Sequence, residues 1–118
     1  MHEVAIVDAL IEQVEEEVRR AGAAGRVTRL ELSIGRLSGV SVDAMRFALE
    51  LLAPGTVVES ARVDIRQPKA LCCCQACGAR TEIEGMDCRC PRCGSCEITI
   101  EGGRDMILES IELEDSDP

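Results

Sequence analysis

The sequence of 118 residues contains almost no aromatic side chains. It has no tryptophan and no tyrosine, and Phe47 is its single phenylalanine. A hydrophobic core must therefore be packed from Leu, Ile, Val, Ala and Met. The aromatic platforms on which many nucleic-acid-binding proteins stack bases are missing as well. A chain of this length holds one domain of ordinary size, and any second unit must be small.

Excess positive charge and long apolar runs are also absent. The formal net charge is -9 and the sequence pI is about 4.6, which disfavours binding to nucleic-acid phosphates and to anionic lipid surfaces. No apolar run approaches the roughly 20 residues that span a bilayer. The opening residues Met-His-Glu-Val do not resemble a secretory signal. We therefore expect a cytoplasmic protein with no nucleic-acid or membrane partner.

Catalytic groups are scarce too. The chain has one histidine, and no nucleophile is accompanied by a recognisable base and orienting residue. We predict that the protein is not an enzyme.

The apolar residues of the first twenty positions recur at steps of three and four, which predicts an amphipathic helix. This helix ends at the glycine-containing segment 21–25. Residues 27–34 alternate between apolar and polar side chains, as in a strand with one buried face. The helix positions are Val4, Val7, Leu10, Ile11, Val14 and Val18.

A second helix is predicted after Ser41, a good N-cap residue, and it ends before Pro54-Gly55. Strands are predicted around 61–66 and 106–113. The apolar positions of the second helix are Val42, Met45, Leu49 and Leu52.

The composition changes after residue 69, where cysteine, glycine and arginine replace the aliphatic pattern. We therefore predict an α+β fold: a small mixed three-stranded sheet with two helices, and an inserted four-cysteine zinc-ribbon domain. Residues 1–69, completed by a strand over 104–114, form the α/β domain. Residues 70–101 form the zinc-binding domain.

Two segments of the inserted region have the same pattern, Cys-x-x-Cys-Gly. They are Cys74-Gln-Ala-Cys77-Gly78 and Cys90-Pro-Arg-Cys93-Gly94. Two thiolates three positions apart can bind one tetrahedral ion, and two such turns complete the four-thiolate shell of a structural zinc site. A glycine with positive φ lets each turn curl back toward its sulfurs. Such a closed shell leaves no coordination position for a substrate.

The other cysteines, Cys72, Cys73, Cys88 and Cys96, leave the composition of the shell open. Cys96 follows Cys93 at the same spacing but lacks a glycine after it, and the other three have the plain interpretation of thiols that bind no metal. A disulfide framework is an alternative for the whole cluster, but it suits secreted proteins better than cytoplasmic ones. An iron site of the rubredoxin kind is a second alternative.

The first residues offer a second metal site. His2 has the plain interpretation of an ordinary terminal residue, and Glu3 that of an acid favoured at a helix N-terminus. The terminal amine of Met1, the backbone nitrogen of His2 and its imidazole can, however, chelate one ion in adjoining rings. A shell rich in nitrogen suits Ni(II) or Cu(II).

Four features together resemble the HypA/HybF family of hydrogenase nickel-incorporation proteins, over nearly the full chain. They are the Met1-His2-Glu3 start, the segment Ser33-Ile34-Gly35, the two cysteine motifs, and Gly103-Arg104-Asp105-Met106 leading into Ile111-Glu112-Leu113.

The resemblance implies a metallochaperone that binds Ni(II) through Met1 and His2, with Glu3 beside them, and delivers it during maturation of [NiFe] hydrogenase. It also implies structural Zn(II) on Cys74, Cys77, Cys90 and Cys93. The implied partners are the nickel-binding GTPase HypB, the hydrogenase large-subunit precursor and, in some members, urease maturation proteins.

Two other functions remain open from the sequence. A zinc-ribbon adaptor that binds nucleic acid or protein would use the same cysteine motifs, although such ribbons usually present basic and aromatic surface. A small redox protein would hold iron on the same four thiolates.

Overall fold

The computed structural model describes residues 2–22, 25–85 and 89–114. The chain divides into two compact units. The first comprises Met1–Leu32, Val40–Ile65 and Leu108–Pro118, and the second comprises Ser33–Gly39 and Arg66–Ile107. The segment 33–39, which the composition grouped with the helices, thus belongs to the unit that contains the cysteines.

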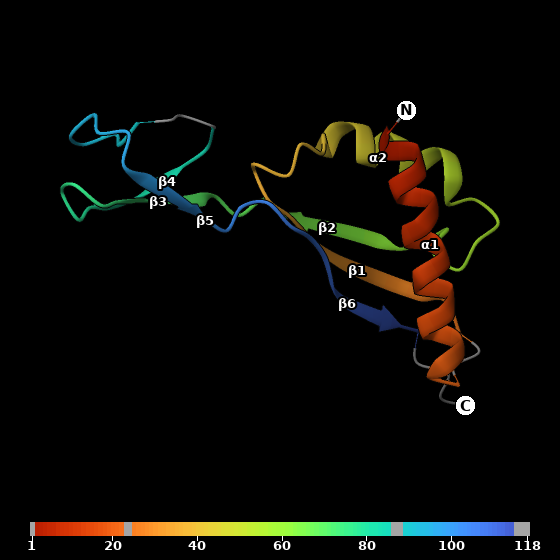
Figure 1. The fold of residues 1–118 in the computed structure, drawn as a ribbon. Coiled ribbons are helices and arrows are strands. Elements are labelled where there is room, and N and C mark those ends of the chain that lie inside the picture. The colour runs from red at the N-terminus through yellow and green to blue at the C-terminus, as the bar shows by residue number, and fades with distance from the viewer. Residues whose placement is uncertain (1, 23–24, 86–88, 115–118) are drawn as a thin grey trace. The chain divides into compact units, whose positions relative to one another are not determined.

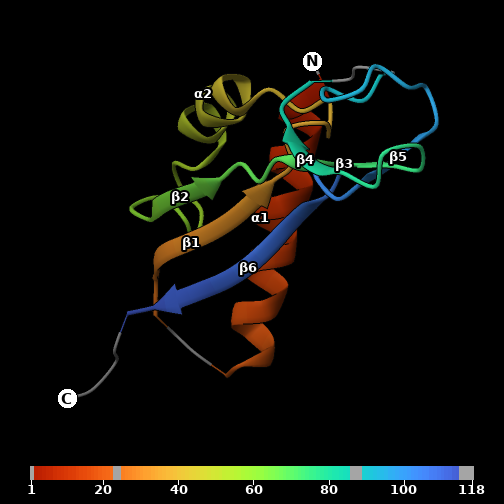
Figure 2. The same cartoon turned by 90° about the vertical axis from the view of Figure 1, so that its left-hand side faces the viewer.

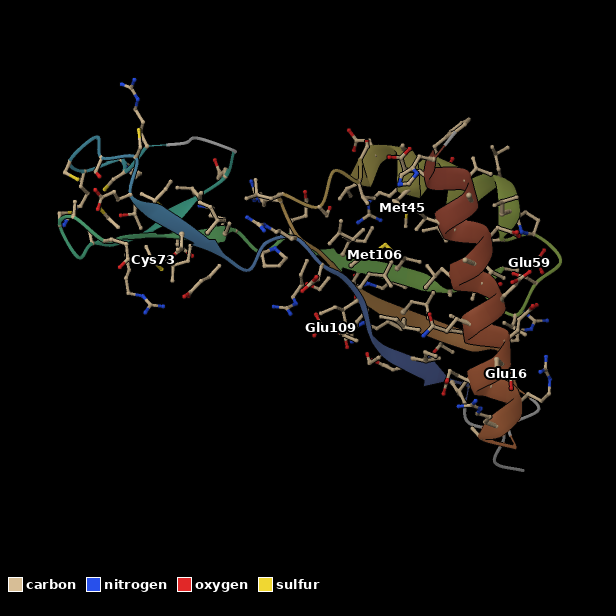
Figure 3. All side chains as sticks on the ribbon, viewed as in Figure 1. Glu16, Met45, Glu59, Cys73, Met106 and Glu109 are labelled. Atoms are coloured by element: carbon tan, nitrogen blue, oxygen red, sulfur yellow. The ribbon has the colours of Figure 1, made fainter. Side chains whose placement is uncertain are left out.

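Two helices cover the sheet of the first unit (Figure 1). Helix α1 (His2–Arg20) buries Val7, Leu10, Ile11, Val14 and Val18, so the predicted apolar stripe is the face that packs inward. Helix α2 (Val42–Leu52) begins after Ser41, whose hydroxyl oxygen accepts a hydrogen bond from the N–H of Ala44 at 3.2 Å. It packs against α1 and buries Met45, Ala48 and Leu49 (Figure 3).

The sheet of the first unit has the strand order β2-β1-β6. Strands β1 (Val27–Ile34) and β2 (Arg62–Arg66) run in the same direction and β6 (Met106–Leu113) runs opposite to them (Figure 2). The sheet is therefore mixed, as predicted. Leu30 and Leu32, two alternate residues of β1, are almost completely buried and contribute to the core of the first unit.

The second unit contains a sheet of its own, with the strand order β4-β3-β5. The central strand β3 (Ala70–Cys74) pairs antiparallel with β4 (Arg80–Ile83) and with β5 (Ile98–Glu101). Its core is small: Ala70, Cys72 and Ile83 are buried, and Leu37, Ile98 and Ile100 pack against them. The cysteine-rich β3 and the polar β4 have no clear apolar alternation, so the sequence pattern does not indicate them.

Three chain segments meet tightly within the second unit. The N–H of Gly35 donates to the carbonyl of Asp105 at 2.9 Å, and the N–H of Arg36 donates to the carbonyl of Pro68 at 3.0 Å. A Cβ on Gly35 would lie 2.2 Å from the carbonyl of Gly103, which is closer than any real contact. Only glycine at position 35 allows these backbones to approach each other so closely.

Within the ranges that the structure describes, no helix combines the length and the apolar character needed to cross a membrane.

Candidate metal centres

Four cysteine sulfurs converge at one end of the second unit. They belong to Cys74, Cys77, Cys90 and Cys93, and all lie within 4.8 Å of one another. The Sγ atoms of Cys74 and Cys93 are 3.6 Å apart, and those of Cys77 and Cys90 are 3.8 Å apart. The structure thus brings together the four residues that the spacing singled out as ligands.

Each Cys-x-x-Cys turn is closed by its own backbone. The N–H of Gly78 donates to the carbonyl of Cys74 at 3.1 Å, and that of Gly94 donates to the carbonyl of Cys90 at 2.9 Å. Both glycines have positive φ, 74° and 77°, the conformation that the sequence pattern requires. The turns therefore point both sulfurs of each pair toward a common centre.

Backbone N–H groups also point at the sulfurs. The N–H of Cys77 donates to the Sγ of Cys74 at 3.3 Å and lowers the pKa of that thiol. The N–H groups of Cys93 and Arg92 lower the pKa of Cys90 to about 6. These hydrogen bonds favour thiolates, which are the form that binds a metal.

The pKa of Cys93, in contrast, is raised. The N–H of Ser95 lowers the pKa of its thiol, but the sulfur of Cys74, burial, and the sulfurs of Cys77 and Cys90 favour the protonated form and together raise the pKa to about 12. Several thiolates this close together repel one another unless a cation lies between them. A metal ion would remove that repulsion and deprotonate all four groups.

The spacing of the sulfurs suits a tetrahedral ion. With metal–sulfur bonds of about 2.3 Å, a regular tetrahedron places its sulfur atoms about 3.8 Å apart. The two measured separations, 3.6 and 3.8 Å, are close to that value. Four sulfur donors of this geometry are typical of zinc or iron rather than of magnesium or calcium. The cluster is therefore a four-cysteine metal site.

The remaining cysteines stand apart from this site. Cys72 is buried in the small core of the unit, Cys73 is half-buried on β3 (Figure 3), and Cys96 is exposed before β5. None of these three is part of the cluster found among the described residues, and no described cysteine is in a disulfide. Cys88 lies outside the described residues.

The predicted N-terminal site lies in the first unit. Met1 lies outside the described residues, whereas His2 is exposed as the first residue of α1. Glu3 is half-buried, and its carboxylate accepts a hydrogen bond from the backbone N–H of Ser41 at 3.2 Å. This hydrogen bond is the main reason why the pKa of Glu3 is lowered.

Ser41 is the residue that the sequence analysis missed at this site. Its hydroxyl group caps α2, which the sequence predicted, while its backbone N–H fixes the Glu3 carboxylate. No local pattern indicates the second contact, because it joins positions that are 38 residues apart. The start of α1 and the start of α2 are thus held together next to His2.

Comparison with known proteins identifies the family. The family model described as "Hydrogenase/urease nickel incorporation, metallochaperone, hypA" matches residues 1–113. The chain belongs to the HypA family. The family, the α+β fold and the role in nickel incorporation that the sequence predicted are therefore confirmed.

Members of the HypA family match over almost their whole length. The hydrogenase maturation factor HypA of Chlorobium limicola is 37% identical over 117 residues, which cover 99% of this chain and 100% of the relative. That of Aquifex aeolicus is 39% identical, covering 97% and 98%. The solution structure of the Ni metallochaperone HypA from Helicobacter pylori superposes with a TM-score of 0.63 at 26% identity, covering 94% and 96%.

Proposed function

We propose that this HypA-family chain binds one Ni(II) at its N-terminus and delivers it during maturation of [NiFe] hydrogenase. The Met1 amine and the His2 imidazole are the principal ligands, and the Glu3 carboxylate contributes beside them. Nitrogen donors of this kind suit Ni(II). The observation that carries the proposal is the position of Glu3, whose carboxylate is fixed next to the only histidine of the chain.

The electrostatics of the first residues support this proposal. The hydrogen bond from Ser41 lowers the pKa of Glu3, so its carboxylate is negatively charged at any physiological pH. A fixed negative charge beside an exposed imidazole attracts a divalent cation. The exposure of His2 leaves that side chain accessible for loading and release.

The cysteine cluster has a different role in this proposal. Cys74, Cys77, Cys90 and Cys93 hold a structural Zn(II), which supplies four metal–sulfur bonds and no reactive position. A closed four-thiolate shell stabilises a fold rather than performing catalysis. The protein is accordingly a carrier and not an enzyme.

The proposed partners follow from the family. They are the nickel-binding GTPase HypB and the hydrogenase large-subunit precursor, with urease maturation proteins as further recipients. The exchange takes place in the cytoplasm, where cysteine thiols remain reduced and available for zinc.

The test is a calorimetric Ni(II) titration of untagged, zinc-loaded protein. The wild type should bind one nickel ion at a specific site, and His2→Ala should lose this site while zinc content and far-UV circular dichroism remain unchanged. Gln13→Ala, an exposed change on the same helix, is the matched control. Equal nickel binding by the wild type and by His2→Ala would rule out the N-terminal site.

A second arm of the same experiment concerns the amine. An N-terminal tag converts it into an amide, so the tagged protein should bind nickel much more weakly than protein with a C-terminal tag. Unchanged affinity with the N-terminal tag would show that Met1 is not a ligand.

A further inference from the structure

Helix α2 exposes two large apolar side chains on one face. Phe47, the only aromatic residue of the chain, is 55% exposed, and Leu51 is 58% exposed. They are four residues apart, so they are neighbours on the helix surface. The opposite face of α2, which carries Met45, Ala48 and Leu49, is already buried in the core. Exposed pairs of this kind mark contact surfaces when they lie within a charged rim.

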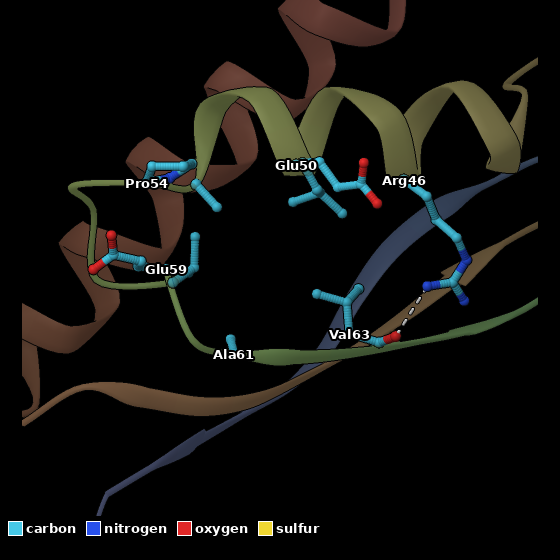
Figure 4. Close-up of a pocket in the computed structure, with 9 residues that line it drawn as sticks. Arg46, Glu50, Pro54, Glu59, Ala61 and Val63 are labelled. Carbon is cyan, nitrogen blue, oxygen red and sulfur yellow. Dashed lines mark hydrogen bonds between the residues drawn. The ribbon is translucent and has the colours of Figure 1, made fainter.

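Two exposed carboxylates flank this pair. Asp43 and Glu50 are exposed on the same side of α2. Arg46, the one basic residue of the helix, instead points toward β2, where its guanidinium donates to the carbonyl of Val63 at 3.3 Å (Figure 4). The apolar pair is therefore bordered by acidic side chains.

A cavity of about 290 Å³ adjoins Glu50 between α2 and β2 (Figure 4). Its walls are mainly apolar and include Leu49, Val58 and Val63. The charged groups of Glu50, Glu59 and Arg46 also line it. Glu59 is held there because it accepts a hydrogen bond from the N–H of Gly55 at 3.2 Å. Because the guanidinium of Arg46 donates to the carbonyl of Val63, the two carboxylates leave the cavity net acidic. Such a cavity fits a lysine or arginine side chain, whose aliphatic stem packs while its charged end meets the carboxylates.

We propose that these features form one docking face, consisting of Phe47, Leu51, Asp43, Glu50 and the adjoining cavity. Its occupant is the protein with which the chain exchanges nickel, and that protein contacts the face with apolar side chains flanked by lysine or arginine. This inference rests on the proposed function. A second copy of the chain is a poor occupant because it would bring the same acidic rim, and a net charge of -9, against this one.

The docking face lies close to the proposed nickel site within the first unit. Helix α2 begins directly after Ser41, the residue that holds the Glu3 carboxylate. Phe47 is six positions further along the helix, a rise of about 9 Å. A partner bound to α2 would therefore reach the first residues of α1 without any change in the fold.

The experiment uses purified HypB from the same organism as the probe, with the untagged, zinc-loaded full-length chain. Binding is measured by calorimetry at low and at physiological salt. The double variant Phe47→Ala, Leu51→Ala should weaken binding by at least about tenfold, the usual consequence of removing central apolar contacts. Glu50→Gln with Glu59→Gln should weaken binding mainly at low salt, because it removes the two carboxylates that line the cavity.

Two matched controls remove similar groups elsewhere. Ile107→Ala deletes an apolar side chain that is 51% exposed on β6, and Glu82→Gln with Glu97→Gln removes two charges from the second unit. Both should bind HypB within about twofold of the wild type. Circular dichroism and zinc content confirm that each variant is folded.

Two outcomes would overturn the docking face. One is equal affinity of HypB for the wild type and for the Phe47→Ala, Leu51→Ala variant, or no binding to either. The other is a wild-type dimer that this variant converts to a monomer, because the occupant would then be a second copy. The Ni(II) titration of the same samples separates this failure from failure of the proposed function, since it depends on His2 and not on α2.

Discussion

The two units of this protein reach stability by different means. The first buries large aliphatic side chains from two helices and a sheet, and Leu30, Leu32 and Met45 are almost completely inaccessible to solvent. Among the described residues of the second unit, the core of its own sheet is formed by Ala70, Cys72 and Ile83, and two of these side chains are small. Hydrophobic burial of that size is small against the entropy of ordering such a segment, so we expect the second unit to depend on a metal at its four-cysteine site.

Their charges differ as well. The first unit contains most of the acidic residues of the chain, while acidic and basic residues are nearly balanced in the second. Negative charge therefore accumulates on the unit that carries His2, Glu3 and the docking face. In the proposed function, the acidic unit binds the nickel cargo, and the metal of the other unit serves only to stabilise the fold.

Removing one of the four cysteine ligands should cause the largest loss of stability, and only the second unit should be affected. In Cys77→Ser, the free energy of metal binding, which is on the order of 10 kcal/mol for small zinc domains, no longer supports the second unit. Zinc content should fall to zero, and amides of β3, β4 and β5 should lose protection from hydrogen exchange. Amides of α1 and β1 should remain protected.

Cys96→Ser is the control, because Cys96 is exposed and stands outside the cluster. It should retain full zinc. A single transition in which Cys77→Ser unfolds both units together would show that the units are not independently stable.

The second prediction concerns the first unit, in which a substitution creates a cavity in the hydrophobic core. Leu30 is completely buried, so Leu30→Ala should destabilise this unit by about 2 to 5 kcal/mol while zinc remains bound. Leu51→Ala removes the same side chain from an exposed position and should change stability by less than about 0.5 kcal/mol. Urea unfolding followed by the circular dichroism of the helices measures both. If folded Leu30→Ala lost its zinc, the metal site of the second unit would depend on the core of the first unit, contrary to this prediction.

The first unit was the more predictable of the two. Its helices and strands follow from the spacing of Val7 to Val18 and from the alternation around Leu30 and Leu32, because burial on one face imposes a regular period on the sequence. Most of the predicted apolar positions are buried, although Val4, Val42 and Leu52 are only half-buried. Phe47 on α2 lay outside the predicted apolar stripe, and it is exposed.

The second unit and the contacts around the sites were less predictable. The spacing of cysteine and glycine identified the four residues of the cluster, because both turns are local. The pairing of β3 with β4 depends on a register that places Cys72 opposite Thr81, and no local period encodes it. The contact between Ser41 and Glu3 was likewise not predicted, because it depends on how the two helices pack.

A smaller effect is expected where backbones cross in the second unit. A Cβ at Gly35 would overlap the carbonyl of Gly103, so Gly35→Ala should displace one of the crossing segments and destabilise this unit by about 1 to 3 kcal/mol. Gly85→Ala is the control, since nothing lies within 4 Å of a Cβ there. The midpoint of zinc removal by a chelator, compared for both variants, measures the difference. Equal midpoints for the two variants would show that the crossing segments can shift without any loss of stability.

The smallest expected effect concerns the charged outer face of the sheet in the first unit. The Nε of Arg29 donates to Asp64 at 2.6 Å, and this hydrogen bond, helped by Arg62, lowers the pKa of the Asp64 carboxyl below 3.8. A carboxyl with a lowered pKa in the folded state stabilises the fold above its ordinary pKa. That contribution is lost as the pH falls through the folded value. Both side chains are partly exposed, so the contribution is small.

Asp64→Asn should therefore reduce hydrogen-exchange protection of β1 and β2 slightly at pH 7, and the difference from wild type should shrink as the pH falls below the ordinary aspartate pKa of about 4. Asp8→Asn, which removes an exposed carboxylate from α1, is the control and should match the wild type throughout. A difference that persists or grows in acid would mean that the hydrogen bonds of Asp64, rather than its charge, stabilise the sheet. The first unit would then depend on polar contacts as well as on its aliphatic core, and the contrast with the metal-dependent unit would be smaller.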